Sequence, residues 1–166
     1  MSNRSLSFIQ PTSQVELESA RALLREYEAS LGISLCFQNF EEEVADLPGK
    51  YSPPSGRLLL AYVDSELAGC VALRQHDSDT GEMKRLFLRP GFRGKGLGKA
   101  LVVKIIDEAK LIGYKAMCLD TIPGKMDSAI ALYEAMGFKD ISPYYDNQAT
   151  DSRFMRKDLR SQIAMS

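Results

Sequence analysis

The chain has 166 residues, of which 45% are hydrophobic and 26% charged, so it is long enough for one substantial core and short for two. Its 21 lysines and arginines nearly balance 22 aspartates and glutamates, which excludes the positive field that would collect nucleic acid or an anionic membrane. The sequence contains no run of 18 apolar residues and no basic-then-apolar leader. We therefore expect one soluble domain over residues 1–166, with no export and no membrane or nucleic-acid partner.

The three cysteines, Cys36, Cys70 and Cys118, are widely spaced and form no C-x-x-C pair. This spacing argues against a disulfide framework and against a zinc site, and we expect no bound metal. A cytoplasmic, reducing compartment fits such thiols best, with each one buried as a small hydrophobic side chain.

The first third of the chain predicts two helices. Ser13 and Glu16 have the spacing of a capping box, and apolar residues then recur every three or four positions until Gly32. Asn39, which precedes three glutamates, predicts the cap of a second, shorter helix that residues 48–49 stop.

From residue 57 the hydrophobic period changes to that of strands. Runs at 58–63, 67–74 and 82–88 are separated by polar turns and predict three antiparallel strands. A strong helical pattern follows from Leu97 and stops at Gly113. A strand, a helix and two short strands complete the chain, at 116–122, 129–136, 138–141 and 154–159. This order implies a mixed α/β sheet covered on both faces.

The most informative segment is a glycine-rich turn between the third of these strands and the strong helix. Its glycines allow the backbone to approach a ligand, and the first amides of a helix have no partner within it. These amides carry the positive end of the helix dipole and suit a phosphate. Arg93, Lys95 and Lys99 add positive charge, which favours the pyrophosphate of a nucleotide-bearing cofactor. The plain alternative is a tight turn with solvated lysines.

Two other phosphate motifs fail on spacing. The dinucleotide fingerprint G-x-G-x-x-G requires a glycine where Lys99 stands, so Asp120 only mimics the acid that would bind a ribose. The P-loop requires a lysine after its last glycine, where Leu97 stands. The turn therefore predicts no nucleoside triphosphate site.

Residues 93–98 match [Q/R]-x-x-G-x-[G/A], the pyrophosphate signature of the GNAT N-acetyltransferase superfamily, and they follow a strand as that signature does. Further along, residues 132–138 fit the L-Y-x-x-x-G-F pattern of the same family. The chain resembles this superfamily over about residues 57–159, whereas its first helices match only in number and position.

The resemblance implies a fold and a cofactor. The fold would be a mostly antiparallel sheet of six to seven strands, flanked by about four helices and splayed between strands 4 and 5. Acetyl-CoA would enter the gap, where its pantetheine arm would pair with the backbone like an added strand. The implied cofactor-binding residues are Leu86, Phe87, Leu88, Arg93, Gly94, Lys95, Gly96, Leu97, Gly98, Lys99, Thr121, Ala129 and Tyr133.

Acetyl transfer to an amine needs a polarised carbonyl and an acid for the departing thiolate. In similar proteins a backbone N–H, here of Leu86 or Leu88, donates to the acetyl oxygen. Tyr133 aligns with the general acid of many family members. The alternative for Tyr133 is a helix tyrosine that is buried against the sheet and hydrogen-bonded locally.

A base is also needed, and Glu82 stands where several similar enzymes place a glutamate that deprotonates the amine, usually through water. An exposed carboxylate that pairs with Lys84 or Arg85 is equally compatible with this position. His76, the only histidine, lies in a polar turn and is interpreted as a bystander.

The first two helices, the loop 32–39 and the C-terminal turn flank the other mouth of the cleft in similar folds, so the resemblance implies that the acceptor binds there. The predicted substrate-binding residues are Tyr27, Tyr144, Tyr145, Asp146 and Asn147, although such residues also form ordinary turns. The sequence thus predicts an N-acetyltransferase that uses acetyl-CoA and acts on a primary amine of a small molecule. A noncatalytic acyl-CoA sensor and a protein or peptide acetyltransferase are the alternatives, and a homodimer is compatible with each.

Overall fold

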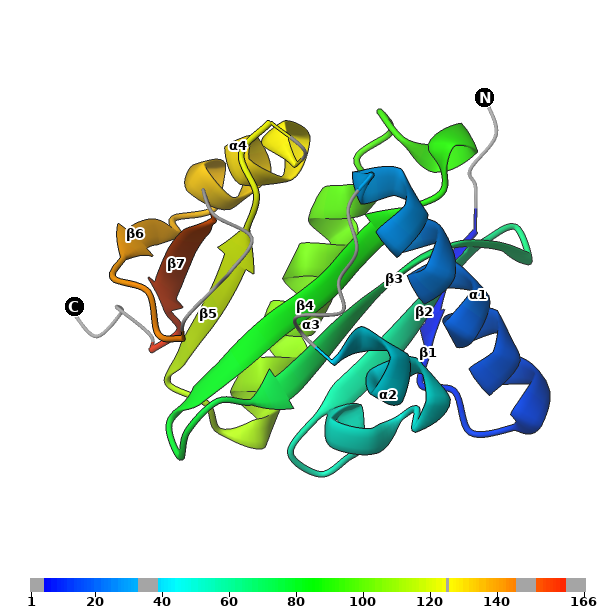
Figure 1. The fold of residues 1–166 in the computed structure, drawn as a ribbon, viewed down its shortest axis with the longest axis horizontal. Helices are drawn as coiled ribbons and strands as arrows, with labels where there is room; N and C mark the ends of the chain where they lie inside the picture. Colours follow the sequence, from blue (N-terminus) through cyan, green and yellow to red (C-terminus); the bar gives the residue numbers. More distant parts are fainter. Residues whose placement is uncertain (1–4, 33–38, 125, 146–151, 161–166) are drawn as a thin grey trace.

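The structure, a computed structural model, describes residues 5–32, 39–124, 126–145 and 152–160, which form one twisted sheet with helices on both faces (Figure 1). The sheet order is β1-β2-β3-β4-β5-β7-β6, and every neighbouring pair is antiparallel except the parallel pair β4–β5. This confirms the predicted mixed, mostly antiparallel sheet. The strands are β1 (Leu6–Ile9), β2 (Arg57–Val63), β3 (Glu66–Gln75), β4 (Thr80–Leu88), β5 (Ala116–Thr121), β6 (Lys139–Ile141) and β7 (Arg153–Asp158).

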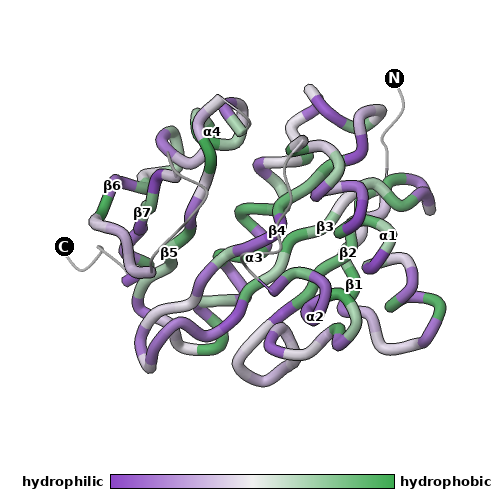
Figure 2. The backbone as a smooth tube through the Cα atoms, viewed as in Figure 1, coloured by the Kyte–Doolittle hydropathy of each residue, from purple (hydrophilic) through white to green (hydrophobic). Residues whose placement is uncertain are grey.

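Each face of the sheet is covered by its own pair of helices. α1 (Gln14–Leu31) and α2 (Phe40–Ala45) pack on one face, and α3 (Leu97–Ile112) and α4 (Asp127–Ala135) pack on the other. Apolar residues run along the central strands between these layers (Figure 2). No helix in the described ranges combines the length and apolarity needed to cross a membrane.

Alternation along β2 shows how the sequence builds two cores. Leu58 and Leu60 belong to the cluster under α1 and α2, whereas Leu59 and Ala61 belong to the cluster under α3 and α4. Successive side chains of a strand point to opposite faces, so a nearly continuous apolar run indicates a strand that is covered on both sides.

Helix ends confirm some local predictions and correct one. The Ser13 side chain accepts a hydrogen bond from the Glu16 amide at 3.1 Å, and the Glu16 carboxylate accepts one from the Ser13 amide at 3.1 Å, which completes the predicted capping box. Gly32, with φ 70°, ends the helix as expected. Asn39 stands at the N-cap of α2 as predicted, but its side chain forms no cap bond, because such a bond needs an extended backbone and Asn39 has φ 58°.

The third predicted strand begins earlier than residue 82, because a tight turn joins β3 to β4. The Asp79 amide donates to the Asp77 carboxylate at 2.9 Å, and this turn lets pairing continue out to Gln75 opposite Gly81. Glu82 is therefore the third residue of β4 rather than the first.

The sheet parts between β4 and β5, as the fold prediction required. The two strands pair only over Thr80–Glu82 and Ala116–Cys118. Beyond these residues β4 follows β3 to Leu88, and β5 follows β7 to Thr121. The facing edges of β4 and β5 are therefore unpaired with each other over the rest of their described lengths (Figure 1).

A β-bulge lies in the part of β4 that borders this gap. The register between β3 and β4 shifts where residues 70–72 face residues 84–87, and Arg85 has φ 60°. An extra residue in one strand interrupts the alternation of side chains. Lys84 and Arg85 consequently line the same cavity although they are adjacent in sequence.

The close approach of β3 and β4 can be tested at Gly69, which faces Leu88. A Cβ at Gly69 would clash with the carbonyl oxygen of Phe87 and lie 2.8 Å from Leu88 Cδ2. Because that oxygen belongs to the backbone, we expect Gly69→Ala to lower the free energy of unfolding by about 2 kcal/mol in urea denaturation. A Cβ at Gly91 would meet nothing within 4 Å, so Gly91→Ala should stay within about 0.5 kcal/mol of wild type. Equal stability of the two variants would contradict the strand spacing.

Candidate active site

The glycine-rich turn leads directly from β4 into α3. After a short 3-10 turn at Pro90–Phe92, Gly94 and Gly96 have φ of 75° and 80°, which L side chains rarely adopt. A Cβ built at either glycine would meet no atom within 4 Å. The surface of the turn is therefore open to a ligand.

The first amides of α3 lack partners within the helix. The first bond of the helix runs from the Ala100 amide to the Gly96 carbonyl at 3.2 Å, and no side chain caps the N-terminus. The amides of Leu97, Gly98 and Lys99 are thus left for an external acceptor, and a phosphate supplies one. Lys95 is exposed on the same turn.

Arg93 is folded back over the end of β4. Its Nε donates to the Leu88 carbonyl at 2.8 Å, and its guanidinium lies 5.6 Å from the centroid of the Phe87 ring. Three residues predicted to bind the cofactor thus contact one another. Arg93 also holds one of the β4 backbone groups that the resemblance assigns to the pantetheine arm.

The predicted cofactor residues beyond the gap lie on β5 and α4. Thr121 is the last residue of β5, and its hydroxyl lies 3.2 Å from the Met126 sulfur. Ala129 and Tyr133 lie one helical turn apart on α4 and pack against the core under α3. The turn and the end of β5 therefore border the same opening from opposite sides.

Tyr133 is buried, with 5% of its surface exposed, and its ring lies 5.7 Å from that of Phe138. Its hydroxyl has no hydrogen-bond partner among the described residues, which differs from the locally bonded tyrosine of the plain alternative. Burial raises the pKa of Tyr133, and the nearby Tyr27 and Asp120 raise it further. The hydroxyl therefore keeps its proton at neutral pH.

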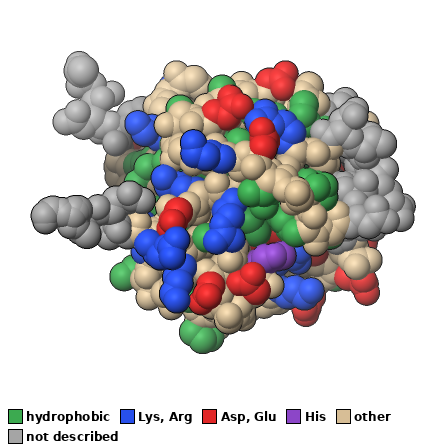
Figure 3. All heavy atoms as spheres, turned by 90° about the vertical axis from the view of Figure 1, so that its left-hand side faces the viewer, with side chains coloured by type: hydrophobic (Ala, Val, Ile, Leu, Met, Phe, Trp, Pro, Cys, Tyr) green, Lys and Arg blue, Asp and Glu red, His purple; other side chains and the backbone are tan. Residues whose placement is uncertain are grey.

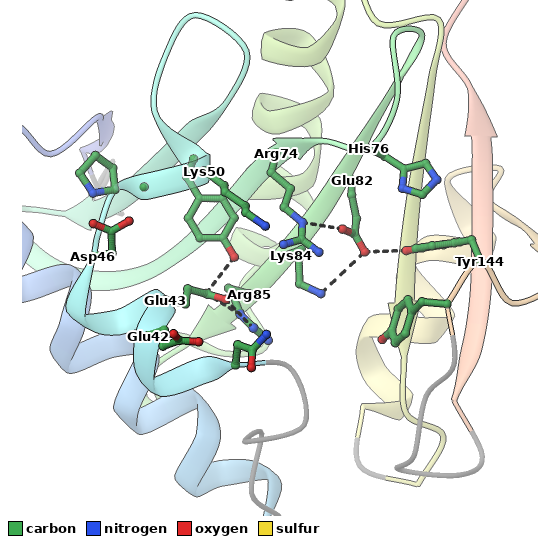
Figure 4. A pocket seen from close by; sticks show the side chains of 15 residues that line it. Glu42, Glu43, Asp46, Lys50, Arg74, His76, Glu82, Lys84, Arg85 and Tyr144 are labelled. Carbon is green, nitrogen blue, oxygen red and sulfur yellow. Dashed lines mark hydrogen bonds and ion pairs between the residues drawn. The ribbon is translucent and has the colours of Figure 1, made fainter.

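Glu82 is not the exposed carboxylate that one interpretation of its position predicted, because only 1% of it is exposed. Its Oε1 accepts a hydrogen bond from Arg74 Nε at 2.8 Å, and its Oε2 accepts one from the Tyr144 hydroxyl at 2.7 Å. Lys84 Nζ lies 3.7 Å from Oε2 (Figure 4). The partners of Glu82 are therefore Arg74, Tyr144 and Lys84 and do not include Arg85, which the bulge directs to α2.

The charge of Glu82 is stabilised in spite of its burial. Burial alone would raise the pKa of Glu82, but Lys84, Arg74 and the hydrogen bonds from Tyr144 and Arg74 together lower it below its ordinary value. Glu82 is therefore ionised at neutral pH.

Asp120 belongs to this site, although the sequence analysis set it aside as a mimic of a ribose-binding acid. Its Oδ1 lies 3.4 Å from Lys84 Nζ, and its Oδ2 accepts a hydrogen bond from the Tyr145 hydroxyl at 2.5 Å. Lys84 on β4 thus bridges to β5 just beyond the point where the strands part. A sequence signal for this contact was available, because residues two apart in a strand point to the same face. Lys84 therefore shares a face with Glu82, and Asp120 shares a face with Cys118.

A second buried ion pair joins β4 to α2. Arg85 donates to both oxygens of Glu43, at 2.9 and 2.8 Å, and Tyr51 donates to Oε2 of Glu43 at 2.8 Å. The guanidinium also lies 5.8 Å from the ring centroid of Tyr27 and 5.1 Å from that of Phe40. Tyr27 is therefore packed beneath Arg85 and does not line the cavity described next.

A cavity of about 500 Å³ opens beside these charges, between α2 and the β3–β4 hairpin (Figure 4). Tyr144 and Tyr145, predicted to bind the acceptor, line it, whereas the predicted Asp146 and Asn147 lie outside the described residues. His76 also lines it, with its ring 4.6 Å from that of Tyr144. The other lining residues are Asn39, Glu42, Glu43, Asp46, Pro48, Gly49, Lys50, Tyr51, Arg74, Glu82, Lys84 and Arg85.

A second hollow of about 770 Å³ lies along β6 and β7 and is mostly basic, and Figure 3 shows lysines and arginines spread over this side. Two of its cations are engaged, since Lys157 donates to the Met136 carbonyl at 2.8 Å and Arg160 pairs with Asp158 at 2.7 Å. It lacks the convergent buried acids and tyrosines of the first cavity, which we therefore take as the active-site candidate. The part of the chain that the structure describes contains no group of three or more acidic, His or Cys side chains able to hold a metal ion.

Comparisons with known proteins agree with this geometry. Residues 18–138 match the family model described as the acetyltransferase (GNAT) family. An uncharacterized N-acetyltransferase of Schizosaccharomyces pombe is 38% identical over 146 residues, which cover 87% of this chain and 89% of that protein. The N-acetylaspartate synthetase of Homo sapiens is 37% identical over 99 residues, 58% of this chain and 32% of that protein. A crystal structure of the PaiA N-acetyltransferase of Thermoplasma acidophilum in complex with coenzyme A has a TM-score of 0.71 at 21% identity, covering 93% of this chain and 99% of that one.

The buried pair of Arg85 and Glu43 predicts a pH-dependent contribution to stability. The Arg85 side chain is only 2% exposed, so Glu43→Gln leaves a buried cation without its counter-ion, and we expect a loss of about 3 kcal/mol at pH 7. Burial opposes ionisation of Glu43, but Arg85 and Tyr51 lower its pKa overall below the ordinary 4.5. The loss should therefore be constant down to about pH 4.5 and shrink as pH falls through the folded-state pKa, where wild-type Glu43 becomes neutral too.

Urea denaturation between pH 7 and pH 3.5 measures this difference. Glu42→Gln is the matched control because Glu42 is exposed on the same helix and has no ion-pair partner among the described residues. It should stay within about 0.5 kcal/mol of wild type. A Glu43→Gln loss no larger than the control's would contradict the buried pair.

Proposed function

The chain belongs to the GNAT acetyltransferase family, whose model matches residues 18–138, and we propose that it transfers the acetyl group of acetyl-CoA to the primary amine of a small molecule. Acetyl-CoA is the co-substrate of this acyltransferase, in line with its N-acetyltransferase relatives and the related fold solved with coenzyme A. The proposal of a small acceptor is supported by the cavity of about 500 Å³, a size typical of small-molecule sites. Fixed charges line this cavity near the point where β4 and β5 part. The similarity to an N-acetylaspartate synthetase supports the same reading.

The parts of the chain proposed to hold acetyl-CoA fit such a ligand. The open turn at Gly94 and Gly96 and the unpartnered amides of residues 97–99 suit its pyrophosphate. The edge of residues 86–88 is unpaired with β5 and suits the amides of the pantetheine arm, apart from the Leu88 carbonyl, which accepts from Arg93. Bound there, acetyl-CoA supplies the activated acetyl thioester. A backbone N–H of Leu86 or Leu88 then polarises the acetyl oxygen.

Two side chains handle the protons of this reaction. Glu82 accepts one proton from the acceptor amine through a water molecule, as the new nitrogen–carbon bond forms. Tyr133 donates one proton to the sulfur as the carbon–sulfur bond breaks. The Tyr133 hydroxyl is protonated at neutral pH and has no hydrogen-bond partner among the described residues, as an acid requires, and Glu82 is ionised, as a base requires.

Tyr133→Phe tests the acid. Removal of the hydroxyl should lower kcat by roughly 100-fold in steady-state acetylation and leave the Kd of acetyl-CoA within about twofold in calorimetry. Tyr114→Phe is the control, since Tyr114 is a buried tyrosine whose hydroxyl donates to the Ser55 carbonyl, outside the cavity. Its kcat should match wild type. An unchanged kcat in Tyr133→Phe would remove the acid role.

Glu82→Gln tests the base. Because its pKa is lowered, Glu82 is ionised throughout pH 6–9, so its own titration does not shape the wild-type pH profile in that range. The variant should lose roughly 100-fold in kcat/KM at each pH from 6 to 9, with the pH at half-maximal activity unmoved. Initial rates across this range give the profile, and urea denaturation reports the separate cost to folding. Wild-type rates in the variant would exclude Glu82 as the base.

The proposed function as a whole is tested by an acetyl-transfer assay against a panel of small primary amines, with acetyl-CoA binding measured in parallel. Transfer to at least one amine, dependent on Tyr133, is the expected result. Tight binding of acetyl-CoA with no transfer to any amine would instead indicate a noncatalytic acyl-CoA sensor.

A further inference from the structure

Charged side chains of both signs line the cavity. The sheet contributes Arg74 from β3 and Lys84 from β4, and Glu82 contacts both of them. The acids Glu42 and Asp46 come from α2 and its C-terminal end, and the 3-10 turn at Gly49–Tyr51 adds Lys50. In Figure 4 the Lys50 side chain extends in the direction of Arg74. Arg74 and Lys50 therefore offer an anion two cationic groups on one part of the cavity.

Arg74 has one bonded nitrogen and two unused ones. Its Nε donates to Glu82 at 2.8 Å, and neither terminal nitrogen has a hydrogen-bond partner among the described residues. Its side chain is 31% exposed. By contrast, Arg85 is 2% exposed and binds both oxygens of Glu43. Arg74 thus presents free N–H groups to the cavity, and Arg85 is committed to α2.

Glu82 holds the guanidinium of Arg74 in one orientation. Glu82 is itself 1% exposed and is fixed by Tyr144 at 2.7 Å and by Lys84 at 3.7 Å. A planar guanidinium that is anchored through Nε keeps its two terminal nitrogens in a fork that matches the two oxygens of a carboxylate. A supporting shell of this kind is what a pre-organised binding site requires.

Register places Arg74 next to the gap. Arg74 pairs with Glu82, and Glu82 is the last residue of β4 that pairs with β5. A molecule held by Arg74 therefore lies beside the opening where the thioester is proposed to lie. We propose that the acceptor is an amine that also carries a carboxylate, an amino acid or close analogue, and that Arg74 binds this carboxylate. The inference rests on the proposed acetyl transfer to a small amine.

The test compares acceptors that differ only in the carboxylate. Initial rates of acetylation by the full chain are measured for L-amino acids, for the same amino acids with every carboxylate converted to its amide, and for simple alkylamines. For the preferred amino acid we expect kcat/KM to exceed that of its amide by about 10- to 100-fold, the range for a hydrogen bond to a charged group. Arg74→Gln should remove this preference, mainly by raising KM for the acid.

Two further variants separate binding from folding. Arg74→Lys keeps the charge but not the fork, so it should retain only part of the preference. Arg25→Gln removes an exposed arginine that pairs with Glu41 and does not line the cavity, and its preference should equal that of wild type. A general loss of stability lowers the rates on acid and amide alike and leaves their ratio unchanged, so the ratio reports the carboxylate contact alone.

The outcomes distinguish this inference from the proposed function. Equal kcat/KM for acids and amides in wild type would overturn the carboxylate-bearing acceptor and leave amine acetylation standing. A preference that persists unchanged in Arg74→Gln would overturn the assignment to Arg74. Failure to acetylate any amine, with acetyl-CoA still bound, would overturn the proposed function and this inference with it.

Discussion

The short ladder between β4 and β5 is the constraint on which the rest of the site depends. Three residue pairs hold the strands together, and beyond Glu82 opposite Cys118 each strand follows its other neighbour. Backbone groups on the facing edges are then left to find partners outside the sheet, which is a costly arrangement unless a ligand or water satisfies them. The same divergence brings the open turn before α3 and the end of β5 to one opening, and it leaves room for Lys84 and Asp120 to meet across it.

The charges at this opening are fixed by one another rather than by solvent. Lys84 lies between Glu82 and Asp120, and each of these acids also accepts a tyrosine hydroxyl from the turn after β6. Buried pairs of this kind contribute little net stability, because desolvation offsets most of their attraction. Their consequence is a rigid polar frame, in which Arg74 is held by Glu82 with its terminal nitrogens turned to the cavity. Through this frame the fold sets the position of Arg74, the residue proposed to bind the carboxylate of the acceptor.

Local signals in the sequence were sufficient where the structure depends on neighbouring residues. The capping box at Ser13 and Glu16, the long helix after Leu97 and the glycine turn before it are all formed by contacts within a few positions, and all were predicted. The parted sheet was predicted through the resemblance to a family and not from periodicity. Asn39 was predicted correctly as the residue before the second helix, but it makes no side-chain cap bond because its backbone is left-handed, which no residue type nearby requires.

The polar contacts of the site could not be predicted in the same way. Arg74 meets Glu82 through strand register, Glu43 meets Arg85 across 42 positions, and Asp120 meets Lys84 across a gap that exists only in the folded sheet. The bulge at Arg85 reverses the facing of the residues after it, so alternation counted along the sequence misplaces that arginine. Tyr144 and Tyr145 were predicted for the acceptor site because the C-terminal turn flanks the cleft in similar folds, and the structure places both on the cavity.

Site-resolved amide hydrogen exchange, measured with and without coenzyme A, tests the central claim most directly. If the unpaired edge of β4 and the open turn hold coenzyme A, its addition should slow exchange for amides of residues 83–88 that do not bond to β3 and for amides 94–99. Amides shared between β2 and β3 should change little. Saturating coenzyme A that leaves residues 83–88 and 94–99 exchanging at their original rates would contradict the account.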